Sequence, residues 1–531
     1  MKYFIFTLFF CLIFGSCTSD RQYVPKERVN AREGRVEVIP QPQQTLLFDG
    51  TFNIGEDVKI VCHKELNEIV ALFNERLSYV SGLTFPVRLK GEAKGNITLK
   101  INAEITNNEG YALTVNPSDI LIEAASPEGI FYGLQTLQQM IIHAEEAKIP
   151  CCSITDAPRF AWRGVMLDVS RTFMPINLLK RYIDLFSAYK LNILHLHLSD
   201  DQGWRIEIKQ YPRLTLVGSK FAPEFNVMGG YYTQDEIREL VRYASLRNIT
   251  IVPEIDMPGH QCAAIAAYPE LSCDGKIPVI HTHLEGPDIH EEIFCAGKES
   301  TYQFVFNVLD EIMTLFPSTC IHIGGDEAPK ANWERCPYCQ QKITDNELKN
   351  EEELQSYFVN RVGTYLREKG RTLVGWDEIL DGGKLTGNEV LMYWRTRNQD
   401  EVAKAIRSGF KVVCTPRTHC YFDYSYDEVK FQSPVPITTH KIFEYEPVIY
   451  DTPEENYIGV QANFWSHLDR SEYNIDKQLF PRIFGLSETA WSMPHNKNWE
   501  HFANLARQHG DRLKTLDDVN VYDDNSLITN Y

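Results

Sequence analysis

The sequence predicts an α/β protein in which a small α+β domain precedes a (β/α)8 TIM barrel. The length of 531 residues exceeds one ordinary domain. From Arg163 onward, short apolar runs alternate with helical stretches, and polar side chains gather where the apolar runs end. Strands that alternate with helices form parallel strands joined by right-handed crossovers, and eight such units close into a barrel. A doubly wound open sheet is the alternative, and the count of eight strands disfavours it.

The chain begins with a segment typical of exported proteins. A lysine precedes an apolar run over residues 4–14, and Gly-Ser-Cys17 follows. This run is too short to cross a membrane as a helix, so residues 1–17 are predicted to be a signal peptide. Its end resembles a bacterial lipobox, although Phe14 stands where leucine is usual. We expect a lipoprotein of the periplasm or cell surface, lipidated at Cys17 and followed by a polar tether over residues 18–34; simple secretion is the alternative.

Charge and missing motifs exclude several classes of function. The formal net charge of -19 argues against nucleic acid and anionic membrane surfaces as partners. Contact with a membrane is therefore expected only through the lipid anchor. The sequence has no Gly-rich phosphate loop such as GxxxxGKS, which disfavours a nucleotide, and no GxSxG elbow of a Ser-His-Asp triad. We expect no cofactor.

The cysteines suggest disulfides rather than a metal. Of 13 cysteines, Cys11 and Cys17 lie in the export segment, which leaves an odd number, so at least one thiol is free or pairs outside the chain. The pair Cys336 and Cys339 lies in a loop, which favours a local disulfide or two unreactive thiols over a redox motif. Zinc needs two further ligands at short spacing, and no second pair is visible, so no metal is expected. One more disulfide is a hypothesis: it would join the cysteines that flank one irregular loop, Cys273 and Cys295.

The small domain is expected over residues 35–155. Four strand-like runs alternate with two helical stretches, which suggests an α+β sandwich. The predicted strands are residues 58–62, 96–101, 111–115 and 120–123, and the predicted helices are residues 65–80 and 128–142. The domain carries no catalytic constellation, so a packing role is expected.

The barrel, with its C-terminal helices, is expected over residues 156–531. The eight predicted strands are residues 164–169, 192–198, 250–255, 320–323, 372–376, 390–394, 411–415 and 459–465. Predicted helices between them include residues 176–189, 234–246, 302–316, 352–369 and 401–408. The link after the seventh strand has the weakest helical signal.

Chemically capable side chains follow every predicted strand. After the fourth strand, two glycines precede Asp326 and Glu327. The others are Asp168, Arg171, Asp200, Asp201, Trp204, Asp256, His260, Trp376, Asp377, Glu378, Trp394, Arg395, Arg417, His419, Tyr421, Asp423, Trp465 and His467. The carboxyl ends of barrel strands form one face, where such enzymes work. Each residue alone has a structural explanation, but acids, an arginine and three strand-end tryptophans on one rim are hard to explain by packing.

This mixture of side chains favours a sugar as the ligand. Tryptophan rings stack on the apolar faces of sugar rings, while Arg and Asp bind hydroxyl groups. A metal bound by His195, His197 and Asp200 is the alternative. Histidines at alternate positions of a strand are more often hydrogen-bonded core residues, so this metal site is disfavoured.

Four motifs in order resemble glycoside hydrolase family 20, the exo-acting β-N-acetylhexosaminidases. They are Arg163-Gly-Val-Met-Leu-Asp-Val-Ser-Arg171, His195-Leu-His-Leu-Ser-Asp-Asp-Gln-Gly-Trp-Arg205, Pro253-Glu-Ile-Asp-Met-Pro-Gly-His260 and His322-Ile-Gly-Gly-Asp-Glu327, with Gly375-Trp-Asp-Glu378 after them. The resemblance covers the chain from about Arg35 to its C-terminus. It implies removal of a terminal non-reducing β-linked GlcNAc or GalNAc from an oligosaccharide or glycoconjugate.

The resemblance also implies a retaining, substrate-assisted mechanism. Glu327 would be the general acid and base, and Asp326 would orient the 2-acetamido group and stabilise an oxazolinium intermediate. We further expect that the charge of Asp326 raises the pKa of Glu327. The implied sugar-binding residues are Arg171 for the 3- and 4-hydroxyls, Trp376, Trp394 and Trp465 around the acetamide and ring, Tyr421 for the acetamide carbonyl and Asp423 for a hydroxyl. The implied supporting residues are Asp200, Asp256 and His260.

One departure from the family pattern and two rival functions remain. His467 occupies a place where the family often has a carboxylate that binds sugar hydroxyls, which leaves the preference between gluco and galacto sugars open. A hydrolase of the same fold with another specificity is one rival, such as one that releases lacto-N-biose or a sulfated GlcNAc. A non-catalytic surface glycan-binding lipoprotein is the other, and it would be expected to lack Asp326, Glu327 or Tyr421, all of which are present.

Overall fold

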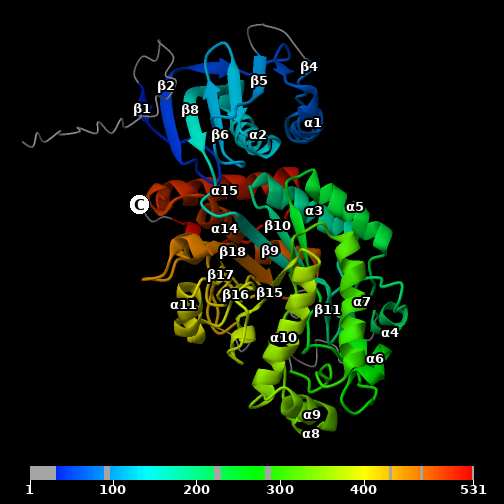
Figure 1. Cartoon of the computed structure of the whole chain (residues 1–531). Coiled ribbons are helices and arrows are strands. Elements are labelled where there is room, and N and C mark those ends of the chain that lie inside the picture. Colours follow the sequence, from blue (N-terminus) through cyan, green and yellow to red (C-terminus); the bar gives the residue numbers. More distant parts are fainter. Residues whose placement is uncertain are drawn as a thin grey trace, which may run out of the picture.

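The predicted barrel is confirmed. The computed structural model describes residues 31–88, 96–219, 229–280, 289–429, 433–466 and 471–528. Eight parallel strands close a barrel in which β9 lies between β10 and β18 (Figure 1). Their bounds are β9 Trp162–Asp168, β10 Ile193–His197, β13 Thr250–Glu254, β14 Cys320–His322, β15 Thr372–Trp376, β16 Val390–Tyr393, β17 Lys411–Cys414 and β18 Tyr457–Phe464. The open doubly wound sheet is therefore excluded.

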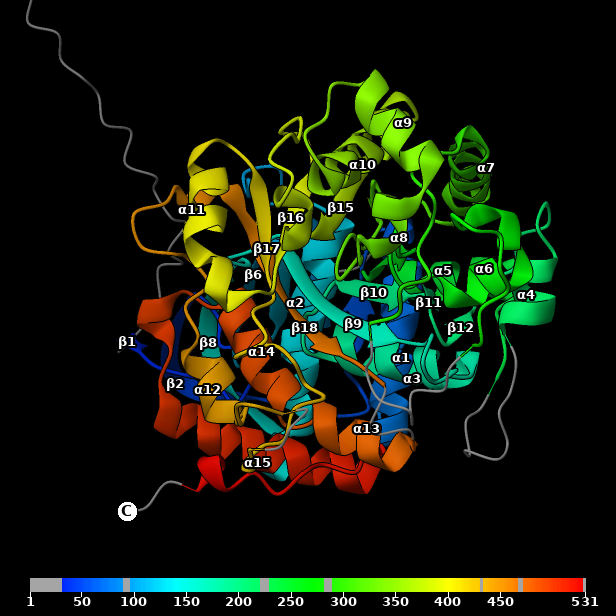
Figure 2. The same cartoon turned by 90° about the horizontal axis from the view of Figure 1, so that it is seen from below.

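Helices surround the strands of the barrel (Figure 2). Their bounds are α3 Ile176–Ala188, α4 Arg213–Gly218, α5 Gln234–Ser245, α6 Cys262–Ala267, α7 Glu299–Leu315, α8 Ala331–Arg335, α9 Pro337–Asp345, α10 Glu351–Glu368, α11 Gln399–Arg407, α12 Thr439–Glu444, α13 Glu472–Leu479, α14 Arg482–Trp491 and α15 Trp499–Leu516. A short two-stranded ribbon, β11 Ser199–Asp200 and β12 Gly203–Trp204, follows β10. Between β17 and β18 the described residues form one α-helix, the six-residue α12, as the weak helical signal there predicted. No helix of the described chain has the length and apolar content needed to cross a membrane.

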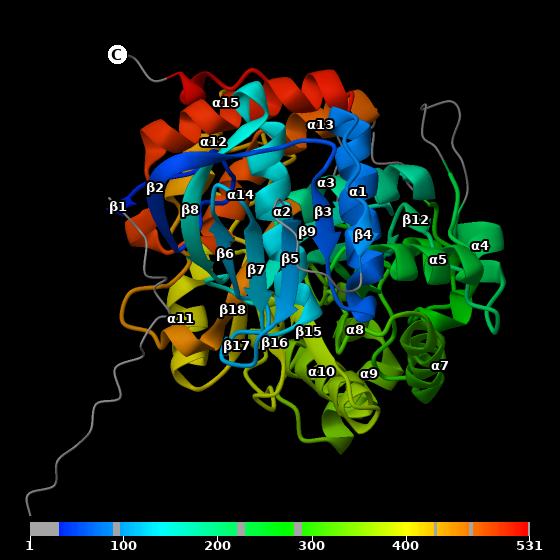
Figure 3. The ribbon, with the colours of Figure 1, turned by 90° about the horizontal axis from the view of Figure 1, so that it is seen from above.

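The described residues of the small domain form eight strands, twice the four that its pattern predicts. Its sheet has the order β1-β2-β8-β6-β7-β5-β3-β4 and lies over one end of the barrel (Figure 3). The bounds are β1 Arg32–Glu33, β2 Gln44–Asn53, β3 Lys59–Val61, α1 Asn67–Ser81, β4 Val87–Arg88, β5 Asn96–Ile101, β6 Tyr111–Val115, β7 Ile120–Ala124, α2 Pro127–Ile142 and β8 Lys148–Asp156. The alternation rule misses β1 and β4 because each has two residues. It misses β2 because of an irregularity in its pairing with β8.

Helix α2 fills the space between the sheet and the barrel (Figure 1). It is buried on nearly every side, and its buried residues include the polar Gln135, Gln138 and Gln139. Ser126 caps its first turn by accepting hydrogen bonds from Glu128 and Gly129, and Pro127 takes the first helical position. Gln139 then reaches the barrel, where its side-chain amide donates to the carbonyl of Ala188 at 3.0 Å. The predicted packing role of this domain agrees with these contacts.

A buried charge pair joins the two domains. Lys190 Nζ, next to α3, lies 3.0 Å from Asp156 Oδ2 at the end of β8, and both side chains are almost fully buried. Asp156 also accepts hydrogen bonds from Tyr111 at 2.6 Å and from the indole of Trp491 at 3.0 Å. Such a pair contributes little net stability, but removing one partner leaves the other charge buried without its partner.

Asp156→Ala is therefore expected to destabilise the protein by about 3–5 kcal/mol, because Lys190 loses its carboxylate in a dry interface. Differential scanning calorimetry would record this as a Tm lower by several degrees. The matched control is Glu123→Ala, which breaks the exposed pair with Lys100 and is expected to shift the Tm little. Equal Tm values for the two variants would contradict the assigned role of the buried pair.

Candidate active site

Asp326 and Glu327 lie on the turn that leaves the carboxyl end of β14. Gly324 and Gly325 precede them with φ angles of +66° and +95°, and Glu327 itself has a φ of +45°. A Cβ at position 324 would overlap the carboxylate of Asp256, so only glycine fits. A glutamate held in the left-handed region is uncommon, and such strained residues cluster at functional sites. The turn buries the side chain of Asp326, while that of Glu327 remains 36% exposed.

His260 contacts both acids. Its Nε2 lies 3.6 Å from Glu327 and 3.8 Å from Asp326, while its Nδ1 lies 3.1 Å from Asp201 and 3.4 Å from Asp200. Burial alone would lower the pKa of His260, but these carboxylates raise it well above its usual value. The imidazole is therefore positively charged at neutral pH and sits beside the two acids.

The pKa values of the two acids shift in opposite directions. Burial, assisted by the charge of Glu327, raises the pKa of Asp326 to about 6, against the opposing charge of His260. Burial also pushes the pKa of Glu327 upward, but the hydrogen bond and charge of His260 outweigh it, and the pKa falls below its usual value. The expectation that Asp326 raises the pKa of Glu327 is therefore wrong for the free protein. The sequence did not reveal that His260 lies in contact with Glu327.

A second network of buried charges lies beneath the acids. Glu254, at the end of β13, contacts His195 at 3.1 Å, His197 at 2.5 Å and His322 at 2.9 Å. His197 also lies 2.8 Å from Asp200. Hydrogen bonds between strands thus account for the histidines that formed the alternative metal set. Sequence reasoning missed Glu254, although a glutamate inside an apolar strand was the available signal.

Four aromatic rings form one group at the strand ends. Trp376 and Trp465 lie 5.9 Å apart between ring centroids, Tyr421 lies 6.3 Å from Trp465, and Trp394 stacks on Tyr421 at 6.1 Å. Hydrogen bonds fix two of the indoles, because Trp376 donates to Glu254 at 3.0 Å and Trp394 donates to Glu378 at 2.8 Å. The strands β15, β16 and β18 thus supply a rigid aromatic wall, as the strand-end pattern predicted.

Arg171 follows the end of β9 and lies beside the aromatic group. Its guanidinium contacts Asp200 at 2.7 Å and Asp168 at 3.5 Å and lies 4.9 Å from the ring of Trp465. Since Asp200 also contacts His260, the arginine and the acid pair share one charged network. His467 lies outside the described residues, so its predicted contact with the sugar stays a prediction.

Some buried oxygens in this group have no partner in the described chain. Oδ1 of Asp326 and Oδ2 of Asp256 meet no donor with hydrogen-bond geometry, and the carboxylate of Asp423 meets no side-chain donor in the described chain. Burial raises the pKa of Asp423 to about 8 and that of Asp256 well above its usual value. Buried polar atoms are normally hydrogen-bonded, so these oxygens point to donors supplied by a ligand.

Glu378 is a further candidate for a functional residue. The sequence predicted it at the rim of the barrel but assigned it no role. Burial, assisted by the charge of Asp326, raises its pKa to about 8. It lines a cavity of about 440 Å³ together with Glu327, Lys330, Trp394 and Arg395, among others. This volume is within the range of small-molecule sites. Because Glu327 lines this cavity, the cavity suits the part of a ligand that extends beyond Glu327.

The barrel and its rim define a class of protein. An acid pair, an aromatic wall and unpartnered buried carboxylates at the carboxyl ends of eight parallel strands are the features of a glycoside hydrolase. The matches of this chain to models of known families agree with this class. Residues 160–494 match the model of the glycosyl hydrolase family 20 catalytic domain, and residues 35–157 match domain 2 of the same family.

Relatives and solved structures carry the same family assignment. A β-hexosaminidase of Porphyromonas gingivalis is 35% identical over 92% of this chain, which spans 66% of that relative's length. The β-N-acetylhexosaminidase of Bacteroides fragilis matches with a TM-score of 0.81 and 32% identity, covering 91% of this chain and 96% of that one. The N-acetyl-β-hexosaminidase of Streptomyces plicatus, solved with thio-NAglucal, matches with a TM-score of 0.80 and 31% identity, covering 93% and 98%. The chain belongs to glycosyl hydrolase family 20.

Proposed function

We propose that this glycoside hydrolase is an exo-acting β-N-acetylhexosaminidase that removes terminal β-linked GlcNAc or GalNAc with retention of configuration. One observation carries the mechanism: Asp326 and Glu327 are adjacent on one turn, and His260 Nε2 contacts both. Acids placed so cannot flank a glycosidic bond from opposite faces, as an ordinary pair does. The nucleophile must therefore come from elsewhere, and the acetamide of the substrate supplies it. The names of the relatives support this proposal.

Each acid has one task in this reaction. Glu327, on the open side, protonates the glycosidic oxygen as the bond to the anomeric carbon breaks. The acetamide carbonyl oxygen attacks that carbon, and the oxazolinium ion that forms is stabilised by the carboxylate of Asp326. Water then attacks the same carbon, Glu327 takes its proton, and the acetamide is restored. The two displacements together retain the anomeric configuration.

The remaining residues hold the terminal sugar. Trp376, Trp394 and Trp465 enclose the acetamide and stack on the ring, and the protonated phenol of Tyr421 donates to the acetamide carbonyl. Hydroxyl groups of the sugar provide the donors that side chains of the described protein do not offer to Asp423. Arg171 binds the 3- and 4-hydroxyls while Asp200 holds its guanidinium. These residues all hold the terminal sugar, which suits release of a monosaccharide.

Glu327→Gln is expected to lower kcat/KM on an aryl β-GlcNAc with a poor leaving group by about 10²–10⁴-fold, because proton donation is lost. The loss should be smaller with a dinitrophenyl glycoside, whose leaving group needs no proton. Asp326→Asn is expected to cost about 10²–10³-fold with both substrates, because it weakens charge stabilisation. Steady-state kinetics on the two glycosides would measure this difference.

The control for these variants is Glu334→Gln, an exposed glutamate of α8 that should leave the rate unchanged. Near wild-type turnover of Glu327→Gln on the poor leaving group would overturn the assignment of the acid. The same panel includes an aryl β-glucoside and an aryl lacto-N-bioside. Equal rates on the glucoside would contradict acetamide participation, and a preference for the disaccharide would replace the exo-monosaccharide activity.

The two acids also predict the pH dependence of the reaction. Catalysis needs one proton on the pair, because Glu327 must be protonated while Asp326 is charged. The pair loses its last proton through about pH 6, the pKa of Asp326, and gains a second one below the lowered pKa of Glu327. The kcat/KM profile should therefore peak at acidic pH and fall about tenfold per pH unit on the alkaline side.

His260→Asn tests the origin of this profile. The positive charge of His260 lowers the pKa of both acids, so its removal should move both limbs of the kcat/KM profile to higher pH. The matched control is His63→Asn, which changes an exposed histidine of the small domain and should leave the limbs in place. Limbs that stay in place in His260→Asn would contradict the electrostatic role of His260.

We also propose that the protein is an exported lipoprotein, anchored through Cys17. The support comes from the sequence alone: the apolar run over residues 4–14, the small residues before Cys17 and the polar stretch that follows. Residues 1–30 lie outside the described ones, while the end of the predicted tether is described and forms β1, Arg32–Glu33. An anchor of this kind would hold the enzyme near glycans of the periplasm or the cell surface.

Metabolic labelling with palmitate should mark the full-length chain and should be lost in Cys17→Ala. Cys11→Ala is the matched control, because it removes the other thiol of the export segment and should keep the label. Labelling that persists in Cys17→Ala, measured by fluorography after gel electrophoresis, would overturn the lipoprotein assignment.

A further inference from the structure

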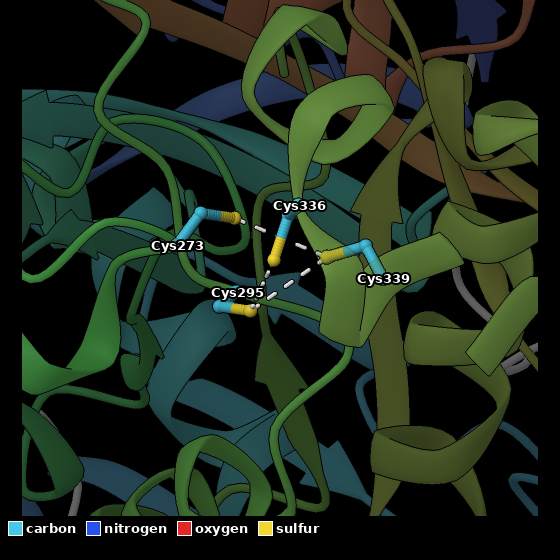
Figure 4. A group of neighbouring side chains, drawn as sticks. All are labelled: Cys273, Cys295, Cys336 and Cys339. Atoms are coloured by element: carbon cyan, nitrogen blue, oxygen red, sulfur yellow. Dashed lines mark hydrogen bonds between the residues drawn. The ribbon is translucent and has the colours of Figure 1, made fainter. Parts of the chain in front are cut away.

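Four cysteines meet at one point outside the active site. Cys273 and Cys295 come from the chain between α6 and α7, and Cys336 and Cys339 come from the insertion after β14. Figure 4 shows the four thiols pointing toward one another, and all four sulfur atoms lie within 4.8 Å of each other. The sequence predicted two separate pairs and no metal. The two pairs are separated by 40 residues along the chain, and the fold brings them together.

The sulfur spacing fits a tetrahedron around one metal ion. Cys295 lies 3.7 Å from Cys336 and 3.6 Å from Cys339, and Cys339 lies 3.9 Å from Cys273. Zinc bound by four thiolates at about 2.3 Å places neighbouring sulfur atoms about 3.8 Å apart. A disulfide instead needs sulfur atoms about 2.05 Å apart. Because Cys295 is equally close to two partners, the cluster has no preferred pairing.

The backbone around the cluster is arranged to hold these sulfurs. Gly297 packs directly on the peptide between Tyr338 and Cys339, where a Cβ would overlap main-chain atoms. Its N–H donates to the sulfur of Cys295, and such hydrogen bonds hold metal-bound thiolates in place. Cys336 precedes the nine-residue α9, and Cys339 lies in its first turn. The positive end of the helix dipole favours thiolates there.

One cation, Lys298, lies beside the segments that carry the cluster. Lys298 directs its ammonium to the carbonyl of Ser272 at 2.5 Å, and it lies 5.6 Å from the ring of Tyr338. Both contacts involve residues adjacent in sequence to cluster cysteines. Three of the four cysteines are buried and Cys273 is half-buried. An ion can therefore reach the cluster from the side of Cys273, while the other three thiols are shielded from water.

We propose that these four cysteines bind one Zn²⁺ ion as a structural site. All four positions of zinc are filled by protein, so no place is left for water or substrate, as in structural rather than catalytic sites. A tetrahedral set of four sulfurs suits zinc, whereas oxygen ligands would suit Mg²⁺ or Ca²⁺. The ligand set is Cys273, Cys295, Cys336 and Cys339.

The site ties together the two loops that carry the active-site charges. Phe294, next to Cys295, donates its N–H to the carbonyl of Pro258 at 2.9 Å, two residues before His260. The indole of Trp333 in α8 donates to the carbonyl of Phe294 at 2.9 Å. Helix α8 begins four residues after Glu327. The zinc ion therefore fixes the insertion after β14 against the chain that follows His260.

The full chain, purified without added chelator or reductant, tests the proposal by two measurements. Plasma mass spectrometry should find about one zinc per chain, and treatment with a mercurial reagent should release it to a chromogenic indicator. Alkylation after denaturation in chelator, without reductant, should label all four cysteines as free thiols in peptide mass spectra. Zinc removal should lower the Tm, because metal bound only by the folded state stabilises it.

The double variant Cys336→Ser, Cys339→Ser should lose the zinc, while its matched control Cys151→Ala, Cys152→Ala should keep it. The control changes two neighbouring buried cysteines of β8, in the other domain. Disulfide-linked peptides among the four cysteines with less than about a tenth of a zinc per chain would overturn the proposal. Iron in place of zinc would overturn the choice of metal. Should the double variant fail to fold, the zinc content and thiol labelling of the wild-type chain still decide between the outcomes.

Discussion

The contact of charged His260 with both acids is the interaction on which the site depends. The imidazole is held on one side by Asp200 and Asp201 and faces Asp326 and Glu327 on the other. Through Asp200 the same charge network reaches Arg171 and the histidines around Glu254. Buried charges of one sign are costly unless opposite charges lie beside them. The charged residues of this network lie on or just after strands β10, β13 and β14. These strands must therefore keep their register to hold the acids beside His260.

Much of this arrangement follows from local sequence because a parallel barrel converts chain order into position. Residues after successive strands share one rim, so Asp326, Trp376, Trp394 and Trp465 were predicted to converge before any contact was known. Strand β15 ends at Trp376 and strand β14 begins at Cys320, as the apolar runs predicted. Two-residue strands such as β1 and β4 lie below the resolution of any periodicity, so these two strands of the small sheet were not predicted.

The features that sequence reasoning missed depend on distances between loops. The pKa of Glu327 depends on a histidine 67 positions earlier in the chain, and its shift comes from a spacing that no pattern encodes. The cysteine cluster likewise joins two segments whose spacing resembles no familiar metal motif. Only Cys336 and Cys339 form a short pair. Contacts that the fold brings about between loops are set by packing, and a single sequence does not reveal them.

The opposite pKa shifts of the two acids assign a role to the substrate itself. In the free protein the shared proton lies chiefly on Asp326, whose pKa is the higher one. An acetamide N–H that donates to Asp326 favours its ionised form, and the oxazolinium charge favours it further. The displaced proton then belongs on Glu327, where the leaving oxygen needs it. A plain glucoside lacks the acetamide and leaves the proton on the wrong acid, so the group that acts as nucleophile also sets the protonation that the reaction requires.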